Sequence, residues 1–149
     1  MRSSIGLICV ALLCVTSSWA GDGAGNAATL LEAYVEAMDA GDVGAEIALF
    51  IAHKDTVSVI DGQVAVGLTA IRQSLEAQDY GAVVMRSARF RNLGDESVAI
   101  FATLGPTRGT REIPGDDTVL LTLVVEKDGG AWQIAHQHVT TIEGGLTKP

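Results

Sequence analysis

The chain has 149 residues, a length that fits one compact domain, and its 18 acidic residues outnumber its 10 Lys and Arg residues. The resulting formal charge of -8 disfavours binding to nucleic acid or to an anionic membrane. Both cysteines, Cys9 and Cys14, lie within the first 20 residues. The remaining chain therefore has no disulfide to stabilise it and depends on its hydrophobic core.

The first 20 residues predict a secretory signal peptide. Arg2 gives a positive start, and the apolar run from Ile5 to Val15 is too short to span a bilayer as a helix. Ser18 and Ala20 are small residues at the positions that a signal peptidase reads, which predicts cleavage after Ala20. A membrane anchor is the alternative. We expect a secreted or periplasmic protein that makes no membrane contact after signal removal, with residues 21–26 as a linker.

The segment after this linker predicts three helices and a small hairpin. The first helix follows an Asn26 cap, carries an apolar stripe at helical spacing and ends at Gly41. A shorter second helix follows Asp42 and runs towards His53. Asp61-Gly62 is a strong turn signal between two short strands, 56–60 and 63–66. The apolar positions of the third helix are Leu68, Ile71 and Leu75.

The hydrophobic period changes to two after Gly81 and predicts four long antiparallel strands. They cover residues 82–93, 97–104, 118–127 and 131–139, with a loop at 105–116 and a tail at 144–149. Helices followed by a meander of strands indicate an α+β fold. We expect three N-terminal helices packed on one face of a curved, mainly antiparallel sheet.

The last strand contains the most suggestive group of side chains. Strict alternation puts Trp132, Ile134, His136 and His138 on one face. Imidazoles titrate near neutral pH, so the histidines are candidates for a general acid and base or for the polar wall of a pocket. The alternatives are a solvated strand end, or a metal site with His53 or a carboxylate as third ligand.

Other candidate residues have simpler interpretations. Tyr34 lies on the apolar stripe of the first helix, where it is either a core tyrosine with a satisfied hydroxyl or a hydrogen-bond donor in a pocket. Trp132 favours core packing, and Asp61 favours a role in its turn. Alternation predicts Arg89 and Arg91 on one solvated strand face and Arg86 on the other.

Several segments together resemble the NTF2-like superfamily, especially its SnoaL-like and ketosteroid-isomerase-like members. The resemblance spans about residues 27–142 and implies a cone-shaped domain over 27–143, in which a strongly bent sheet wraps around the helices and a pocket opens between them. It also implies homodimers formed through the sheet. The segments that carry it are 34–42, 48–50, 55–57, 67–71 and 130–138.

The steroid isomerase branch of this superfamily can be compared residue by residue. Tyr34 falls where these enzymes have a helix tyrosine. The position of their aspartate base falls at Val59, and that of their second acid falls near Thr122 or Leu123. Two of the three groups are missing, which argues against steroid isomerase activity.

Two classes of function fit these observations. The first is a mainly apolar pocket for a small apolar or aromatic molecule, with isomerase, cyclase or dehydratase chemistry by His136, His138 and Tyr34. No cofactor or metal is expected for it. The second is a non-catalytic module that dimerises or binds a protein through the apolar strand 119–125. The residues predicted to line the pocket are Tyr34, Met38, Phe50, Val59, Trp132, His136 and His138.

Overall fold

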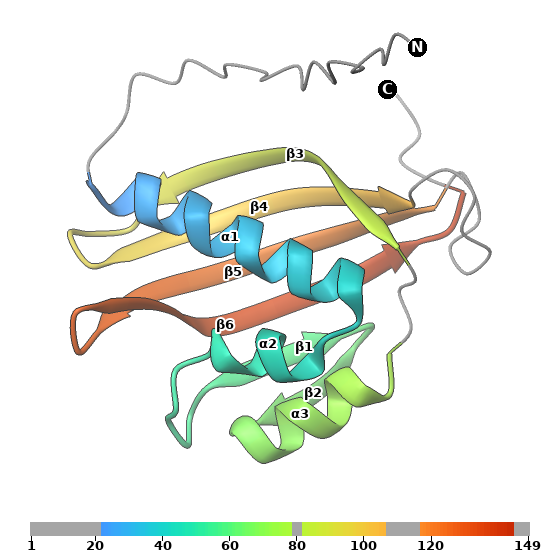
Figure 1. The fold of residues 1–149 in the computed structure, drawn as a ribbon, viewed down its shortest axis with the longest axis horizontal. Coiled ribbons are helices and arrows are strands. Elements are labelled where there is room, and N and C mark those ends of the chain that lie inside the picture. Colours follow the sequence, from blue (N-terminus) through green and yellow to red (C-terminus); the bar gives the residue numbers. More distant parts are fainter. Residues whose placement is uncertain (1–21, 79–81, 107–116, 145–149) are drawn as a thin grey trace, which may run out of the picture.

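A computed structural model describes residues 22–78, 82–106 and 117–144. Its elements follow the predicted order of helices, a small hairpin, a third helix and four long strands (Figure 1). The predicted signal peptide, most of the 105–116 loop and most of the tail lie outside the described residues. The elements are α1 (Asp22–Ala40), α2 (Val43–Ala48), β1 (Val57–Ile60), β2 (Gln63–Val66), α3 (Leu68–Glu76), β3 (Val83–Asn92), β4 (Ser97–Pro106), β5 (Thr118–Asp128) and β6 (Ala131–Ile142).

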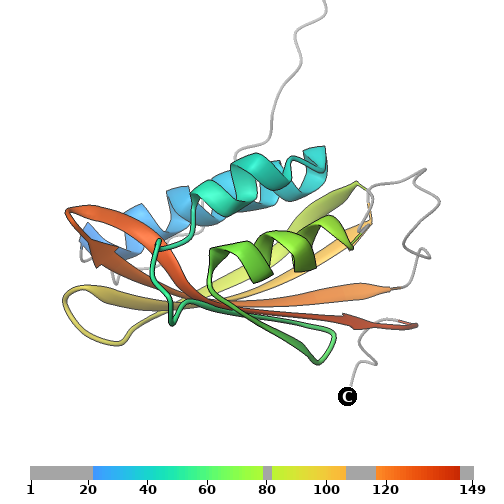
Figure 2. The same ribbon diagram turned by 90° about the horizontal axis from the view of Figure 1, so that it is seen from below.

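The six strands form one sheet in the order β2-β1-β6-β5-β4-β3. The pairing of β1 with β6 is parallel, and the other four pairings are antiparallel. The sheet is curved, and all three helices cover the same face of it (Figure 2). We call this covered face the inner face and the opposite one the outer face. The predicted α+β class is confirmed.

The hydrophobic core lies between the helices and the inner face. Full burial of one aliphatic or aromatic side chain contributes about 1.5–3 kcal/mol, so this layer supplies most of the stability of the fold. Its largest fully buried apolar residues are Leu31, Tyr34, Phe50, Ile60, Ile71, Ile100, Leu104, Leu121, Leu123 and Ile134.

Two helix boundaries differ from the sequence prediction. Helix α1 begins at Asp22, so the predicted cap at Asn26 is wrong and residues 22–26 are helical. At Gly23 a Cβ would come within 3.2 Å of the Trp132 ring, so the glycine lets the first turn of α1 lie close to Trp132. Helix α2 ends at Ala48, well before His53.

The predicted Asp61-Gly62 turn is confirmed. Both residues have positive φ, 47° and 83°, as a two-residue hairpin of type I′ requires. The backbone N–H of Asp61 donates to Val139 O at 3.0 Å, and its Oδ1 accepts from the Thr141 N–H at 2.8 Å. The turn thus fastens the β1–β2 hairpin to β6.

No helix in the described part of the chain is long and apolar enough to cross a membrane.

Candidate functional site

A chain of polar side chains crosses the otherwise apolar interior. It joins Tyr34 of α1, Glu46 of α2, Ser58 of β1 and Gln137 of β6, and each of these residues is buried. Gln137 Nε2 donates to the Tyr34 hydroxyl at 2.7 Å, and Ser58 Oγ donates to Gln137 Oε1 at 3.4 Å. The Tyr34 hydroxyl in turn hydrogen-bonds the carboxyl of Glu46. Four separate elements therefore meet at one polar site under the helices.

Glu46 is the titratable group of this buried chain. Its burial in the core raises the pKa of the carboxyl from 4.5 to about 7, although the Tyr34 hydrogen bond favours the ionised form and offsets part of the rise. The charge of Asp42 at the start of α2 raises the pKa slightly further. A carboxyl with a pKa of about 7 can both accept and give up a proton near neutral pH, which is the property of an efficient general acid or base.

The local sequence explains how a carboxyl comes to lie inside. Residues 43, 46 and 47 follow the i, i+3, i+4 spacing of a buried stripe on α2, and two of them are Val43 and Ile47. Glu46 takes the third position. Tyr34 is held from the other side, where its ring packs edge-on against Phe50 with centroids 6.5 Å apart. An acid on an apolar stripe is the sequence signal that would have identified Glu46.

The prediction that four alternating residues of the last strand share a face is wrong beyond Ile134. The strand contains a β-bulge at Ala135, because Val125 pairs with Ile134 whereas Val124 pairs with His136. The extra residue reverses the alternation. Gln137 consequently points inward and is completely buried, whereas His136 and His138 lie on the outer face with their strand neighbours Val57 and Val59.

The remaining candidates divide between the two faces. Met38 and Phe50 belong to the core, and Trp132 packs against it from its margin, so these three lie on the same side of the sheet as Tyr34. Val59 is on the outer face beside His138. The predicted lining therefore does not surround one cavity. The part of it that shares the interior with Glu46 is Tyr34, Met38, Phe50 and Trp132.

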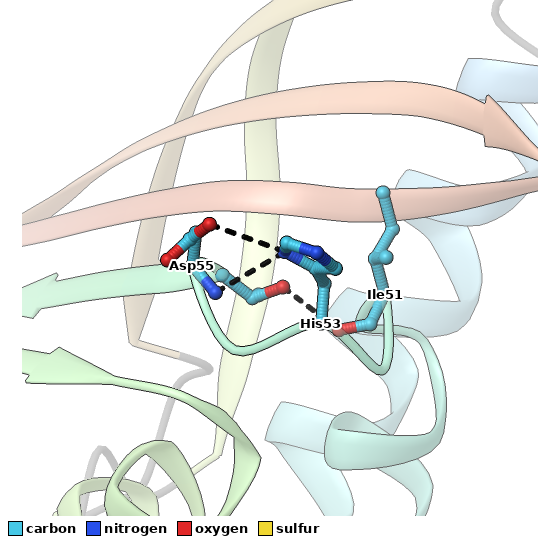
Figure 3. A network of polar contacts seen from close by, with 4 residues as sticks. Ile51, His53 and Asp55 are labelled. Atoms are coloured by element: carbon cyan, nitrogen blue, oxygen red, sulfur yellow. Dashed lines mark hydrogen bonds and ion pairs between the residues drawn. The ribbon is translucent and has the colours of Figure 1, made fainter.

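The third histidine, His53, lies in the loop between α2 and β1 (Figure 3). Its Nδ1 accepts from the Asp55 N–H at 3.3 Å and is 3.6 Å from Asp55 Oδ2, and both side chains are mostly exposed. The carbonyl of Ile51 accepts from the His53 N–H and from Thr56 Oγ1, each at 2.8 Å. These contacts shape the loop. Among the described residues, no three His, Cys, Asp or Glu side chains gather at a possible metal site.

The outer face of the sheet has a different character from the interior. Two rows of side chains cross all six strands, and they contain no Asp or Glu in a chain with 18 acidic residues. Exposed apolar residues stand near both ends, with Val64 67% exposed, Val66 53% and Phe101 48%. The rows are Val66, Val57, His136, Val124, Ala99 and Arg91, and Val64, Val59, His138, Thr122, Phe101 and Arg89.

Helices packed on one face of a curved, open six-stranded sheet define an α+β protein of the NTF2-like type. A family model for the SnoaL-like domain matches residues 27–142, which is most of the chain. The protein therefore belongs to the SnoaL-like domain family. No curated protein matches the sequence.

Solved structures with the same fold share little sequence with this chain. A cystatin-like fold protein from Caulobacter vibrioides is 21% identical with a TM-score of 0.68, covering 83% of this chain and 92% of its own. An NTF2-like protein of unknown function from Shewanella oneidensis is 18% identical with a TM-score of 0.65, covering 78% and 98%. An NTF2-like protein from Streptomyces avermitilis, provisionally assigned as a dehydratase, is 17% identical with a TM-score of 0.63, covering 82% and 97%.

Proposed function

We propose that this SnoaL-like domain binds a small, mainly apolar or aromatic organic molecule under its helices and exchanges a proton with it through Glu46. The observation that carries the proposal is the buried carboxyl of Glu46, whose pKa is about 7, hydrogen-bonded to Tyr34 in an apolar interior. Perturbed acids in apolar surroundings are enriched at binding and catalytic sites. The provisional assignment of the Streptomyces avermitilis relative as a dehydratase is consistent with proton-transfer chemistry.

The reaction class that fits is proton transfer next to a carbonyl group. The ionised Glu46 would take a proton from the carbon beside the carbonyl, and the electrons of that C–H bond would move onto the carbonyl oxygen. The protonated Glu46 would then return a proton to carbon. Tyr34 would position the carboxyl and favour its ionised form, and Gln137 would hold the Tyr34 ring in place. His136 and His138, predicted earlier for this role, lie on the other side of the sheet.

Deuterium incorporation tests this proposal. 2-Cyclohexen-1-one in D2O at neutral pH is expected to exchange its acidic C–H protons faster when the protein is present, as followed by proton NMR. Glu46→Gln is expected to lower the catalysed rate by about 100-fold or more, the usual contribution of a general base. Glu36→Gln, on the exposed side of α1, removes the same charge and is expected to have no effect. Equal rates for the wild type and Glu46→Gln would refute the role of Glu46.

A second candidate function is self-association through the outer face. With about 4.8 Å between strands and about 3.3 Å per residue, this face covers roughly 750 Å2, close to the ~800 Å2 per partner of a stable interface. The absence of acidic residues from its two rows matches the charge depletion at the centre of protein interfaces. Two copies of an acidic protein could therefore bring these rows together without carboxylates repelling each other at the centre of the interface.

Sedimentation equilibrium at pH 8 tests the self-association. Phe101→Glu would put a charge on an exposed residue within the rows of the outer face and is expected to abolish association. Leu93→Glu makes the same change at a residue that is 55% exposed just beyond β3, and it is expected to associate like the wild type. A wild type that stays monomeric at about 100 μM, or a Phe101→Glu variant that still associates, would rule out this interface.

A further inference from the structure

His136 and His138 occupy the centre of the outer face. His136 pairs with Val57 of β1 and with Val124 of β5, and His138 pairs with Val59 and Thr122 of the same two strands. Each imidazole is therefore flanked on both sides by uncharged side chains. Any partner that covers the outer face must also cover these two rings.

The charged groups nearest to the two histidines lie outside the positions that flank them directly. Within the rows, Arg91 shares the row of His136 and Arg89 shares that of His138, each at the far β3 edge. Glu126 lies beyond the His136 row, opposite Gln133. Asp61 lies beyond the His138 row, and its Oδ1 accepts from the Thr141 N–H. The neighbours on β1 and β5 have no titratable group, and Thr140 Oγ1 is 3.3 Å from His138 Nε2.

We propose that the outer face is a pH-sensitive interface between two copies of this chain, which protonation of His136 and His138 separates. The proposal rests on the self-association suggested above and adds its regulation. The occupant is a second copy because the whole outer face is about as large as a stable interface requires, and because its two central rows present no carboxylate to the same rows of an identical chain.

The direction of the pH effect follows from the charge that the interface would have to bury. In a pair of chains, four imidazoles would lie between two apolar sheets, where a charge without a partner is costly. The pKa of His136 is already lowered in the single chain, first by burial and then by the proximity of His138. Association would bury His136 more deeply and lower its pKa further. Dissociation is therefore coupled to proton uptake, so association is strongest at pH 8 and weakens as the pH falls through the histidine range.

Sedimentation equilibrium of the purified protein at pH 8, 6.5 and 5 tests the proposal. The wild type is expected to lose at least about tenfold in association constant between pH 8 and pH 5, because a single coupled proton can change it tenfold per pH unit below its pKa. His136→Gln/His138→Gln removes both titrating rings and keeps polar side chains of similar size. We expect this double variant to associate equally well at the three pH values.

Two further variants separate the histidines from other titrating groups. His53→Gln removes the remaining histidine, which is exposed in the loop before β1, and should keep the pH dependence of the wild type. Glu46→Gln removes the buried acid and should also associate with the same pH dependence as the wild type. A wild type that associates equally at pH 5 and pH 8 would overturn the proposal but leave the interface standing. A double variant that still dissociates at pH 5 would overturn the role of the histidines.

Discussion

Glu46 occupies a position that the surrounding helix reserves for an apolar side chain. A hydrophobic residue beside Val43 and Ile47 would complete the apolar side of α2, whereas a carboxyl at this position has to be accommodated, neutral or ionised, in an apolar layer. The chain compensates with three polar partners in series, Tyr34, Gln137 and Ser58. Departures from local consistency of this kind concentrate at functional sites, which is why we place the chemistry here.

The raised pKa of Glu46 predicts an unusual dependence of stability on pH. The folded-state pKa of about 7 lies above the value of 4.5 for the free side chain, so the folded chain binds the extra proton. Its favourable contribution is complete below pH 4.5 and is lost as the pH rises to 7 and above. The loss amounts to about 3 kcal/mol, because one pKa unit corresponds to about 1.4 kcal/mol.

Urea unfolding at pH 5 and pH 8 measures this contribution. Glu46→Gln should remove this contribution. From pH 5 to pH 8 the free energy of unfolding of the wild type should therefore fall by about 2.5 kcal/mol more than that of the variant. Glu36→Gln serves as the control for loss of an exposed carboxylate and should parallel the wild type. A carbon-13 NMR titration that put the Glu46 midpoint below pH 5 would contradict both the raised pKa and the stability argument.

The sequence contained the signal for one part of the buried site but not for the rest. Tyr34 was recognisable because it lies on the apolar stripe of an amphipathic helix, and Glu46 could have been found by the same criterion on α2. Gln137 could not have been found in this way, because strict alternation places it on the face of the strand that Ile134 does not share. The interior position of Gln137 depends on the bulge at Ala135, and no glycine or proline marks that bulge.

At the scale of elements, the last strand shows why periodicity predicts a fold better than a site. Its existence and its pairing with β5 and β1 follow from composition and turn signals. The identity of the residues that point inward depends on one extra residue, since a shift of one position exchanges the two faces. Two bulges, at Arg86 and Ala135, each make such a shift in this sheet. Arg86 lies over Gly105, where a Cβ would overlap its guanidinium group.

The junction of the β1–β2 hairpin with β6 depends on Asp61. Asp61→Ala would remove the acceptor for the Thr141 N–H and force alanine into a positive-φ conformation. We expect a loss of about 2–3 kcal/mol in urea unfolding, from about 1–2 kcal/mol for the φ strain plus the lost hydrogen bond. Asp61→Asn keeps an acceptor oxygen and tolerates positive φ, so it should lose less than about 1 kcal/mol.

A second substitution separates the two contributions of Asp61. Asp61→Gly relieves the backbone strain but still lacks the acceptor, and it should fall between the alanine and asparagine variants. Asp95→Ala, in the exposed turn before β4, controls for the loss of a surface carboxylate. If Asp61→Ala is no less stable than Asp95→Ala, the turn does not fasten the hairpin to β6.

At the scale of the whole molecule, an acidic protein has one basic sheet edge. Strand β3 is the last strand of the sheet, and most of its residues are exposed, including Phe90 at 38%. An edge of this kind is a template for pairing with other chains. Arg89 and Arg91 border it on the outer face, and the bulge at Arg86 distorts its regular pairing pattern. Charges and bulges are the usual means of preventing edge-to-edge association.

Arg89→Val/Arg91→Val distinguishes edge protection from net charge. The change makes a protein of formal charge -8 more acidic by two, which on charge alone should increase its solubility. It also creates a long apolar edge strand, which should promote aggregation. We expect the edge effect to dominate, so light scattering at 37 °C should rise faster than for the wild type. Arg72→Val on the exposed side of α3 should not aggregate faster, and equal scattering by all three proteins would show that the arginines do not protect β3.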